Sequence, residues 1–358
     1  MQYSWKDFFK LPERKHAIHI IGAGSIVADA HLPAYKKAGF QVASITDLNE
    51  SRAKSLASKY LIPNTYSSVI RLLENVDEND IFDLAVPANI IEQILKLLPK
   101  NSAVLIQKPM GENYESAKKI AEVCELRNLT ACVNFQLRFS PYIQAVRELI
   151  DNNAIGSLHD IDVRLNVYTP WHLFEFLMKE PRLEIQYHSI HYIDCIRSFI
   201  GNPSAIYAKT VKDPWVKELS STRTNMILDY GETLRANINC NHTHKFGHTH
   251  QESYIKWEGE KGAIRVQIGL LLNYPKGKED CLEICKLEDS ESSPSWEKVE
   301  IDGTWFPDAF IGTMASLQNK IEDPNLELPT HYLDSLKTMA CVEAAYQSSE
   351  GGGIPLPE

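Results

Sequence analysis

The sequence lacks an excess of basic residues, a long hydrophobic run and an apolar leader. Its 37 Lys and Arg residues against 47 Asp and Glu give a net charge of −10, which disfavours a polyanionic partner such as nucleic acid. No stretch approaches the roughly 20 apolar residues of a membrane span, and residues 1–15 lack the apolar core of a signal peptide. We therefore expect a soluble cytoplasmic protein with neither a nucleic-acid nor a membrane partner.

Cysteine is also sparse, and its pattern disfavours a disulfide framework. The seven cysteines, at positions 124, 132, 195, 240, 281, 285 and 341, are an odd number scattered through predicted helices and strands, which favours reduced thiols. Cys281 and Cys285 have no second pair at ligand spacing. We predict no metal site.

What the chain does have is length, with 358 residues and 44% hydrophobic content, enough for two domains. Strands alternate with helices in the first part, which predicts a doubly wound parallel sheet with right-handed crossovers. The expected strands are Ile18–Ile21, Gln41–Thr46, Ile81–Val86, Ala103–Ile106 and Ala131–Phe135.

Beyond Arg138 strands follow strands, which indicates an α+β domain with a mostly antiparallel sheet open on one face. A helix from Glu184 to Phe199 interrupts this series. The expected strands are residues 158–168, 205–211, 224–230, 233–244, 252–258 and 263–269. We expect domains at residues 1–135 and 136–358, with the open face lining a cleft or a subunit interface.

A glycine turn follows the first strand, and the helix after it begins near Ser25 and Ile26. Gly22 and Gly24 allow close backbone approach to a pyrophosphate, whereas the third position of the dinucleotide fingerprint is Val27. The same turn also occurs as a plain strand-to-helix connection. Asp47 ends the second strand, at the offset expected for a carboxylate that binds a ribose. We expect Val27 to pack against the sheet at the cost of a small helix shift.

Lys108 follows a buried strand and precedes Pro109, at the sheet edge where ligands bind in open α/β folds. A partly desolvated ammonium there can stabilise charge on a reacting alcohol or carbonyl oxygen. The alternative is a surface lysine after a strand. Pro87, which stops the preceding strand, is expected at the same edge and is assigned to cofactor binding.

The helix at 184–199 carries polar residues at helical spacing. Tyr187, His191 and Asp194 fall on one stripe, and His188 flanks it. A histidine beside a tyrosine and a carboxylate is a plausible acid/base relay, because neutral imidazole accepts a hydroxyl proton near pH 7. The alternative is a histidine packed on an ordinary helix face.

Two weaker features complete the candidate list. The aromatic segment from Tyr168 to Phe176, with Trp171, is suited to wall a sugar site, although core packing explains it equally well. His242 and His244 share one face of a predicted strand, which suits a substrate pocket, half of a metal site or solvated side chains. Of these residues we assign Trp171 and His242 to the substrate site.

The motifs, taken in order, resemble those of the glucose-fructose oxidoreductase, inositol dehydrogenase and MocA (Gfo/Idh/MocA) family. They are Gly22-Ala-Gly24, His31-Leu-Pro-Ala-Tyr35, Asp47, Gln107-Lys108-Pro109, Arg138-Phe139 and Ser189-Ile-His191-Tyr-Ile-Asp194. The resemblance implies a Rossmann domain, an α/β domain with an open-faced sheet, NAD or NADP, a sugar or polyol substrate, and homo-oligomers (dimers or tetramers) assembled through that sheet. Lys108 matches the family's Glu-Lys-Pro lysine, and His191 matches its general acid/base.

Three positions depart from the family pattern. Gln107 replaces the motif's glutamate, Tyr187 replaces an aspartate, and Ile91 stands where many members carry a histidine. A divergent enzyme and a non-catalytic cofactor-binding protein both fit these departures. Because Lys108 and His191 are retained, we favour the enzyme.

The leading hypothesis is reversible hydride transfer between C4 of a nicotinamide and a carbinol carbon of a sugar, polyol or sugar lactone. His191 moves the hydroxyl proton, Lys108 polarises the oxygen, and Tyr187 or His188 completes the pocket, with Arg138 and Asp194 as further substrate-site candidates. Asp47 favours NAD over NADP, and Arg52, one helical turn further on, tempers that preference. The alternatives are an NAD-assisted glycosidase of the same family and a cofactor-sensing binding protein.

Overall fold

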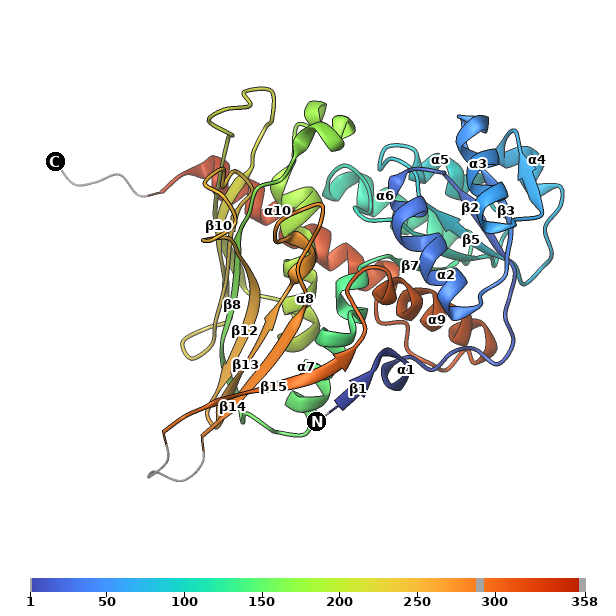
Figure 1. Ribbon diagram of the computed structural model, residues 1–358. Helices are drawn as coiled ribbons and strands as arrows, with labels where there is room; N and C mark the ends of the chain where they lie inside the picture. The colour runs from blue at the N-terminus through green and yellow to red at the C-terminus, as the bar shows by residue number, and fades with distance from the viewer. Residues whose placement is uncertain (1, 288–292, 354–358) are drawn as a thin grey trace. The chain divides into compact units, whose positions relative to one another are not determined.

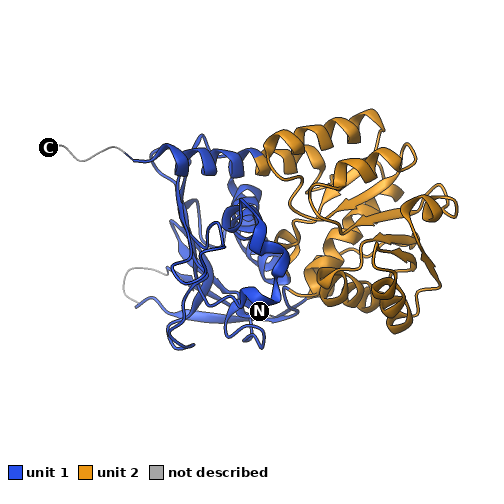
Figure 2. Cartoon of the chain, turned by 90° about the horizontal axis from the view of Figure 1, so that it is seen from above, with its two compact units in different colours: residues 1–4, 141–305, 340–358 blue, residues 5–140, 306–339 orange. Residues whose placement is uncertain are grey.

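The computed structural model describes residues 2–287 and 293–353, which form two compact units, each built on its own β-sheet (Figure 2). Unit 1 contains residues 1–4, 141–305 and 340–358, and unit 2 contains residues 5–140 and 306–339. Each unit therefore combines segments that are far apart in the sequence. None of the helices in the described ranges has the length and hydrophobicity that a membrane crossing requires.

Unit 2 contains a six-stranded sheet in which every pair of neighbours is parallel, as the alternation of strands and helices predicts. Its strands read across the sheet as β4 (Asn64–Tyr66), β3 (Val42–Thr46), β2 (Ile18–Ile21), β5 (Ile81–Leu84), β6 (Ala103–Ile106) and β7 (Thr130–Val133). The connecting helices are α2 (Leu32–Ala38), α3 (Glu50–Tyr60), α4 (Val69–Leu73), α5 (Ile91–Leu97) and α6 (Tyr114–Leu126). The strand order reverses between β2 and β5, the place where open α/β sheets bind ligands.

Unit 2 also includes residues 306–339, which the expected boundary at residue 135 assigns to the second domain. Helix α9 (Asp308–Glu322) packs beside α2, and Lys37 forms an ion pair of 2.6 Å with the buried Asp308. A Cβ on Gly312 would lie 2.8 Å from the Cβ of Phe139, so only glycine allows this close approach of helix and chain. The first segment of the unit ends at Ser140.

Unit 1 contains a nine-stranded, mostly antiparallel sheet, which confirms the expected second sheet. Its strands in order are β1 (Gln2–Ser4), β15 (Trp296–Asp302), β14 (Cys281–Lys286), β13 (Gly262–Gln267), β12 (Glu252–Gly259), β8 (Leu158–Asn166), β11 (Arg235–Asn241), β10 (Arg223–Asp229) and β9 (Ala205–Val211). The β1/β15 and β8/β11 pairs are parallel.

Helices cover only one face of this sheet in the part of the chain that the structure describes (Figure 1). Helices α7 (Pro141–Asp151) and α8 (Ile190–Ile200) lie on that face, and the second half of α10 (Tyr332–Gly351) belongs to the same unit. The short helix α1 (Trp5–Phe8) follows β1 in the chain.

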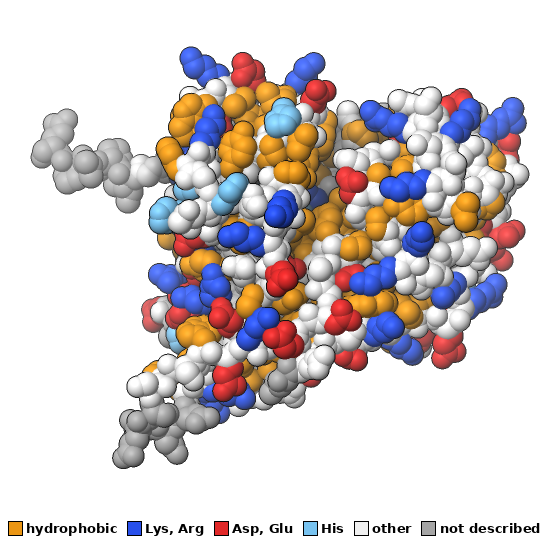
Figure 3. Space-filling model, viewed as in Figure 1, with side chains coloured by type: hydrophobic (Ala, Val, Ile, Leu, Met, Phe, Trp, Pro, Cys, Tyr) orange, Lys and Arg blue, Asp and Glu red, His pale blue; other side chains and the backbone are white. Residues whose placement is uncertain are grey.

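Buried side chains alternate along the strands with more exposed ones, so one face of the sheet is buried and the other faces solvent. On β8, Ile161, Val163 and Leu165 are buried, whereas the intervening Asp162 and Arg164 lie on the other face. Arg164 donates to Asn239 at 2.6 Å and to Glu252 at 3.0 Å, so side chains of the outer face pair with one another. Acidic and basic side chains are likewise interspersed over the surface seen in Figure 3.

Candidate functional site

The turn after β2 contains two glycines with different surroundings. The backbone at Gly22 allows only glycine, whereas Gly24 has open space beside it. Gly22 has φ of 110°, and a Cβ there would lie 2.2 Å from the carbonyl oxygen of Ala85, so a larger residue is excluded. Apart from Gly24 and its neighbours in the chain, no heavy atom of the described residues lies within 4 Å of a Cβ built on Gly24. The space over Gly24 is what close approach of a pyrophosphate requires, so the turn fits a dinucleotide.

The helix that follows departs from regular α geometry. Residues Val27–His31 form a π-helical turn before α2 begins, and Val27 is fully buried, as predicted. The helix therefore contains a widened turn close to its start. The N–H groups of Ser25 and Ile26 belong to the first turn, whose N–H groups have no intrahelical acceptors and are suited to bind a phosphate.

Asp47 links the end of β3 to the glycine turn. Its carboxylate accepts the N–H of Ala23 at 2.7 Å and the N–H of Asn49 at 2.7 Å. Asn49 in turn caps α3 by accepting the N–H of Arg52, whose own side chain is exposed. The carboxylate is thus fixed beside the turn, where a ribose hydroxyl can donate to it.

Replacing the two glycines by alanine should have different results. Gly22→Ala should lower the free energy of unfolding by about 2 kcal/mol or more, because φ is positive and the Cβ clashes with backbone. Gly24→Ala should leave stability within about 0.5 kcal/mol but weaken NADH binding at least roughly tenfold, because its methyl group fills the open space. Urea unfolding and NADH fluorescence titration measure both; equal NADH affinity in wild type and Gly24→Ala would contradict the assignment of this turn.

Lys108 lies directly after β6, two strands away from the glycine turn in the sheet order. Burial lowers the pKa of Lys108 to about 8. The Lys108–Pro109 peptide is cis. A lysine directly after β6 with a pKa of about 8 suits a group that exchanges or shares a proton with a substrate.

Gln107 belongs to a buried hydrogen-bonding network that extends behind Lys108. Its side-chain oxygen accepts from Asn134 at 3.0 Å, and the Asn134 amide also lies 3.3 Å from Nε2 of His31. Nδ1 of His31 is 2.7 Å from Asp83, and the Tyr35 hydroxyl donates to the same Asp83 oxygen at 2.7 Å. This network ties the π-helical turn to the ends of β5, β6 and β7.

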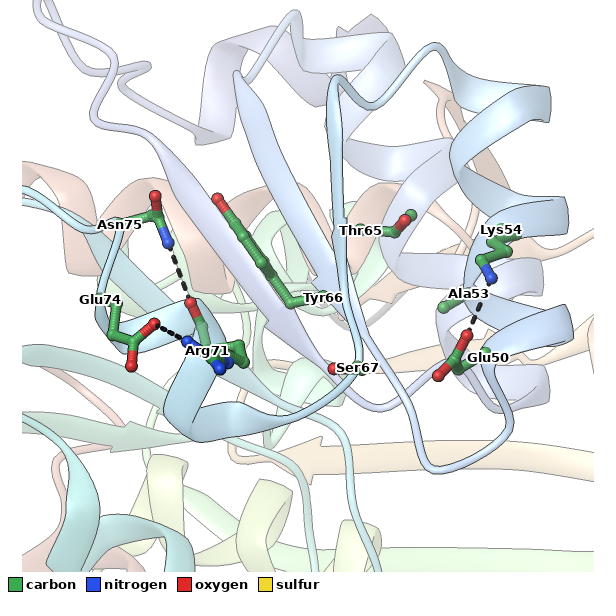
Figure 4. A pocket seen from close by; sticks show the side chains of 9 residues that line it. All are labelled: Glu50, Ala53, Lys54, Thr65, Tyr66, Ser67, Arg71, Glu74 and Asn75. Carbon is green, nitrogen blue, oxygen red and sulfur yellow. Dashed lines mark hydrogen bonds and ion pairs between the residues drawn. The ribbon is translucent and has the colours of Figure 1, made fainter.

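A pocket of about 470 Å³ lies beside the edge strand β4 in unit 2 (Figure 4). Two helices contribute to it. Glu50 and Lys54 form an ion pair on α3, and Arg71 of α4 pairs with Glu74, which directly follows that helix. The remaining lining residues are Ala53, Thr65, Tyr66, Ser67 and Asn75. The pocket does not include Asp47, Lys108 or the two glycines, so the sequence-predicted cofactor residues lie outside its lining.

Arg138 is held by a segment far away in the sequence. The residue lies in the short 3₁₀ helix Gln136–Phe139, and its guanidinium donates to Asp334 at 2.7 Å and to the carbonyl of Pro329 at 2.9 Å. It is 8% exposed. The structure thus places this predicted substrate residue in an ion pair that joins two segments of unit 2.

In unit 1, the helix expected at 184–199 divides into two parts. Residues Ile185–Ser189 form a π-helical turn, and α8 follows from Ile190. Both His191 and Asp194 are buried, at 7% and 1% exposed. The His191 ring stands edge-on to Trp305, with centroids 5.9 Å apart, and Asp194 pairs with Arg197 at 3.9 Å.

Tyr187 projects from the π-helical turn toward the aromatic segment. Its ring lies 6.3 Å from that of Phe176 in an edge-on arrangement. It also packs against the apolar cluster of Trp171, Leu177, Leu183 and Leu219. The structure therefore brings Tyr187 together with the aromatic segment in a buried cluster.

His188 and His242 form a close pair of rings. Their centroids are 4.4 Å apart, and Trp171 lies 5.6 Å from His188 and 5.8 Å from His242. His242 is only 1% exposed, because it follows the end of β11 and turns inward beneath Trp171. The structure thus brings together three residues that the sequence predicts for the substrate site, namely Trp171, His188 and His242. Of the two histidines, His242 is the one that is buried.

Two buried residues, one in each unit, are absent from the site residues predicted from the sequence. Glu184 is 0% exposed and its Oε1 lies 3.6 Å from Nε2 of His242, while Asn134 bridges Gln107 and His31. Glu184 sits in an otherwise apolar run, Leu183 to Ile185, and an acidic residue in such a run is the available sequence signal. Asn134 ends a buried strand and carries a weaker signal of the same kind.

Two family models match the chain. The first is described as an oxidoreductase family with an NAD-binding Rossmann fold and matches residues 17–135. The second is described as the GFO/IDH/MocA C-terminal domain and matches residues 143–265. The matched stretches fall on the six-stranded sheet and on much of the nine-stranded sheet.

Individual relatives are distant but extend over nearly the full length. A D-apiose dehydrogenase of Rhizobium rhizogenes is 23% identical over 342 residues, covering 93% of this chain and 95% of the relative. A levoglucosan dehydrogenase in complex with NADH and levoglucosan has a TM-score of 0.79 at 15% identity, with 94% of this chain and 98% of that chain covered. An Agrobacterium radiobacter oxidoreductase in complex with NAD⁺, L-tartaric acid and magnesium has a TM-score of 0.77 at 20% identity, with 95% and 98% covered.

Proposed function

Because the chain belongs to the Gfo/Idh/MocA family of NAD-binding oxidoreductases, we propose that it interconverts a hydroxyl-bearing carbon of a sugar or polyol and the corresponding carbonyl. The observation that carries this proposal is the pairing, on one sheet, of the open glycine turn at Gly24 with a lysine whose pKa is about 8. The first supplies a dinucleotide cradle and the second a polarising group.

Each catalytic role is assigned from chemistry. NAD, when bound, accepts or returns a hydride at C4 of its nicotinamide ring. His191 takes the hydroxyl proton as the alcohol is oxidised, and the Lys108 ammonium donates a hydrogen bond to the same oxygen. Tyr187 and His188 complete the pocket, together with Trp171. An aromatic ring suits the apolar face of a sugar.

The cofactor is held by the glycine turn and the neighbouring strand ends. The N–H groups at Ser25 and Ile26 bind the pyrophosphate, Asp47 accepts from the ribose, and Pro87 borders the site after β5. The names of relatives that act on D-apiose and levoglucosan support a carbohydrate substrate. A panel of sugars, polyols and sugar lactones, read by NADH absorbance, tests the proposal. Release of aglycone from a glycoside without net NADH change, or no turnover of any substrate, would overturn it.

The cofactor preference is a prediction of its own. We expect kcat/KM with NAD to exceed that with NADP at least roughly tenfold, because the Asp47 carboxylate accepts from a 2′-hydroxyl and repels a 2′-phosphate. Asp47→Ala should lower the ratio of kcat/KM with NAD to kcat/KM with NADP. Arg52→Ala should keep kcat/KM with NAD within twofold of the wild-type value. Steady-state kinetics with both cofactors measures the ratio, and equal or better activity with NADP would refute the preference.

We further propose that the chain works in the cytoplasm as a homo-oligomer, a dimer or tetramer, assembled through the open face of the nine-stranded sheet. The seven cysteines, all in the described ranges, are free thiols. The open face exposes Ile227 and Tyr207 on paired strands, at 50% and 59%. Sedimentation of Ile227→Asp should show dissociation relative to wild type, and a monomeric wild type would reject this assembly.

A further inference from the structure

We propose that Glu184 is a positioning residue: its buried carboxylate closes the π-helical turn through Ser189 and, with His242, fixes the ring of His188 in the substrate site. This inference rests on the proposed function for its kinetic consequence. Its structural part stands on the contacts of the turn itself.

The carboxylate and the hydroxyl lie at the two ends of the turn. The Ser189 hydroxyl lies 2.8 Å from one Glu184 oxygen and 3.1 Å from the other, and both residues are 0% exposed. They are five positions apart, the separation that a π turn brings together. In a regular α-helix, side chains three or four apart share a face, so the same two groups would point in different directions. The side-chain contact and the backbone geometry therefore support each other.

The same carboxylate faces the sheet through His242. Oε1 of Glu184 lies 3.6 Å from Nε2 of His242, and Nδ1 of that ring is 2.9 Å from the Thr169 hydroxyl. His242 is thus hydrogen-bonded at Nδ1, while its Nε2 faces the carboxylate without a hydrogen bond. Its ring packs at a tilt against that of His188, which is carried by the π turn that Glu184 closes. The carboxylate consequently determines His188 from two sides, through its backbone and through the ring beneath it.

The Cys240 thiol and the Tyr192 hydroxyl lie near this carboxylate. Burial, followed by the nearby Glu184 charge, raises the pKa of the Cys240 thiol, and burial, followed by Cys240 and then Glu184, raises the pKa of the Tyr192 hydroxyl. A carboxylate among such neutral groups is retained at a cost in desolvation. A role of Glu184 in positioning the ring of His188 accounts for that cost.

Two substitutions test the inference. Ser189→Ala removes the donor, and Glu184→Gln keeps the shape and one acceptor but removes the charge facing His242. Each should lower kcat for the sugar about tenfold or more, since small misplacement of a site group is costly. The NADH dissociation constant should stay within twofold, because the predicted cofactor residues belong to unit 2. Glu283→Gln, which removes the partner of Arg265 on the outer face of the sheet, is the matched control and should keep full activity.

A readout independent of turnover separates this inference from the proposed function. In protein labelled with ¹⁵N-histidine, the ring signals of His188, identified by their loss in His188→Gln, should move in both variants without any substrate present. Unchanged His188 signals, or kcat within twofold of wild type in both folded variants, would overturn the inference. If wild type oxidises no sugar, the proposed function fails, and the His188 signals still decide whether Glu184 positions that ring.

Discussion

Replacing His191 by asparagine is expected to lower kcat for sugar oxidation by roughly 10²–10⁴-fold, the range for loss of a general acid/base. Asparagine keeps a polar side chain of similar size but has no basic nitrogen, so the hydroxyl proton has no acceptor. NADH binding should be unchanged, because the predicted cofactor residues belong to unit 2. Stopped-flow measurement of hydride transfer and equilibrium titration with NADH give the two quantities separately.

The matched control is His159→Asn, which changes an exposed histidine on β8 in the same unit. It should retain wild-type kcat and so show that loss of a histidine alone does not impair the protein. Wild-type turnover by His191→Asn would exclude this residue as the acid/base. Activity restored to that variant by added imidazole would strengthen the assignment.

Replacing Lys108 by methionine is expected to reduce kcat/KM by roughly 10²–10³-fold, the range found when a donor to a developing oxyanion is removed. Methionine fills similar volume but cannot donate a hydrogen bond to the substrate oxygen. Kinetics at saturating NAD measure the loss. An effect below threefold would mean that Lys108 does not contact the reacting oxygen.

The pH dependence of the wild type follows from the same group. Burial lowers the pKa of Lys108 to about 8, so the ammonium that polarises the oxygen is lost as pH rises through that value. We expect kcat/KM to fall on the alkaline side of about pH 8. The guanidinium of Lys108→Arg stays charged, so kcat/KM of this variant should not fall as the pH rises through about 8. A wild-type profile flat from pH 7 to 10 would contradict the assignment.

The same shift makes Lys108 a burden on stability. Its folded pKa of about 8 lies below the ordinary 10.5, so between these values the unfolded chain binds more protons and stability rises with pH. Below about pH 8 the ammonium is charged in both states and its burial penalty is fully present. Lys108→Met should therefore raise the free energy of unfolding at pH 7 by about 1–3 kcal/mol. Urea unfolding at pH 7 and pH 10 measures the difference.

The central strands of unit 2 could be predicted from the sequence because their composition is decisive. Ile18–Ile21 and Ala103–Ile106 are short apolar runs, and both strands have the predicted bounds. Strand β4, Asn64–Tyr66, was missed because a three-residue polar segment has no periodicity. Only its pairing with β3 makes it a strand.

Some features of the candidate site could be predicted from the sequence and others could not. Lys108 and Asp47 were located because each follows a strand at a known edge of a parallel sheet. The π turns at Val27–His31 and Ile185–Ser189 were not foreseen, because hydrophobic spacing does not distinguish a widened turn from an α-helical one. The inward direction of His242 was not foreseen either, since it depends on where β11 ends and on Trp171 above it.

The pairing of β1 with β15 also has a consequence for the order in which the protein is made. Residues Gln2–Ser4 precede their partner strand, Trp296–Asp302, by some three hundred residues in the order of synthesis. The Rossmann-type sheet likewise waits for α9, which is encoded after that strand. During translation both units therefore remain unfinished until the last part of the chain emerges, and closing such long loops is slow. A nascent chain stalled before residue 296 should remain protease-sensitive at its N-terminus.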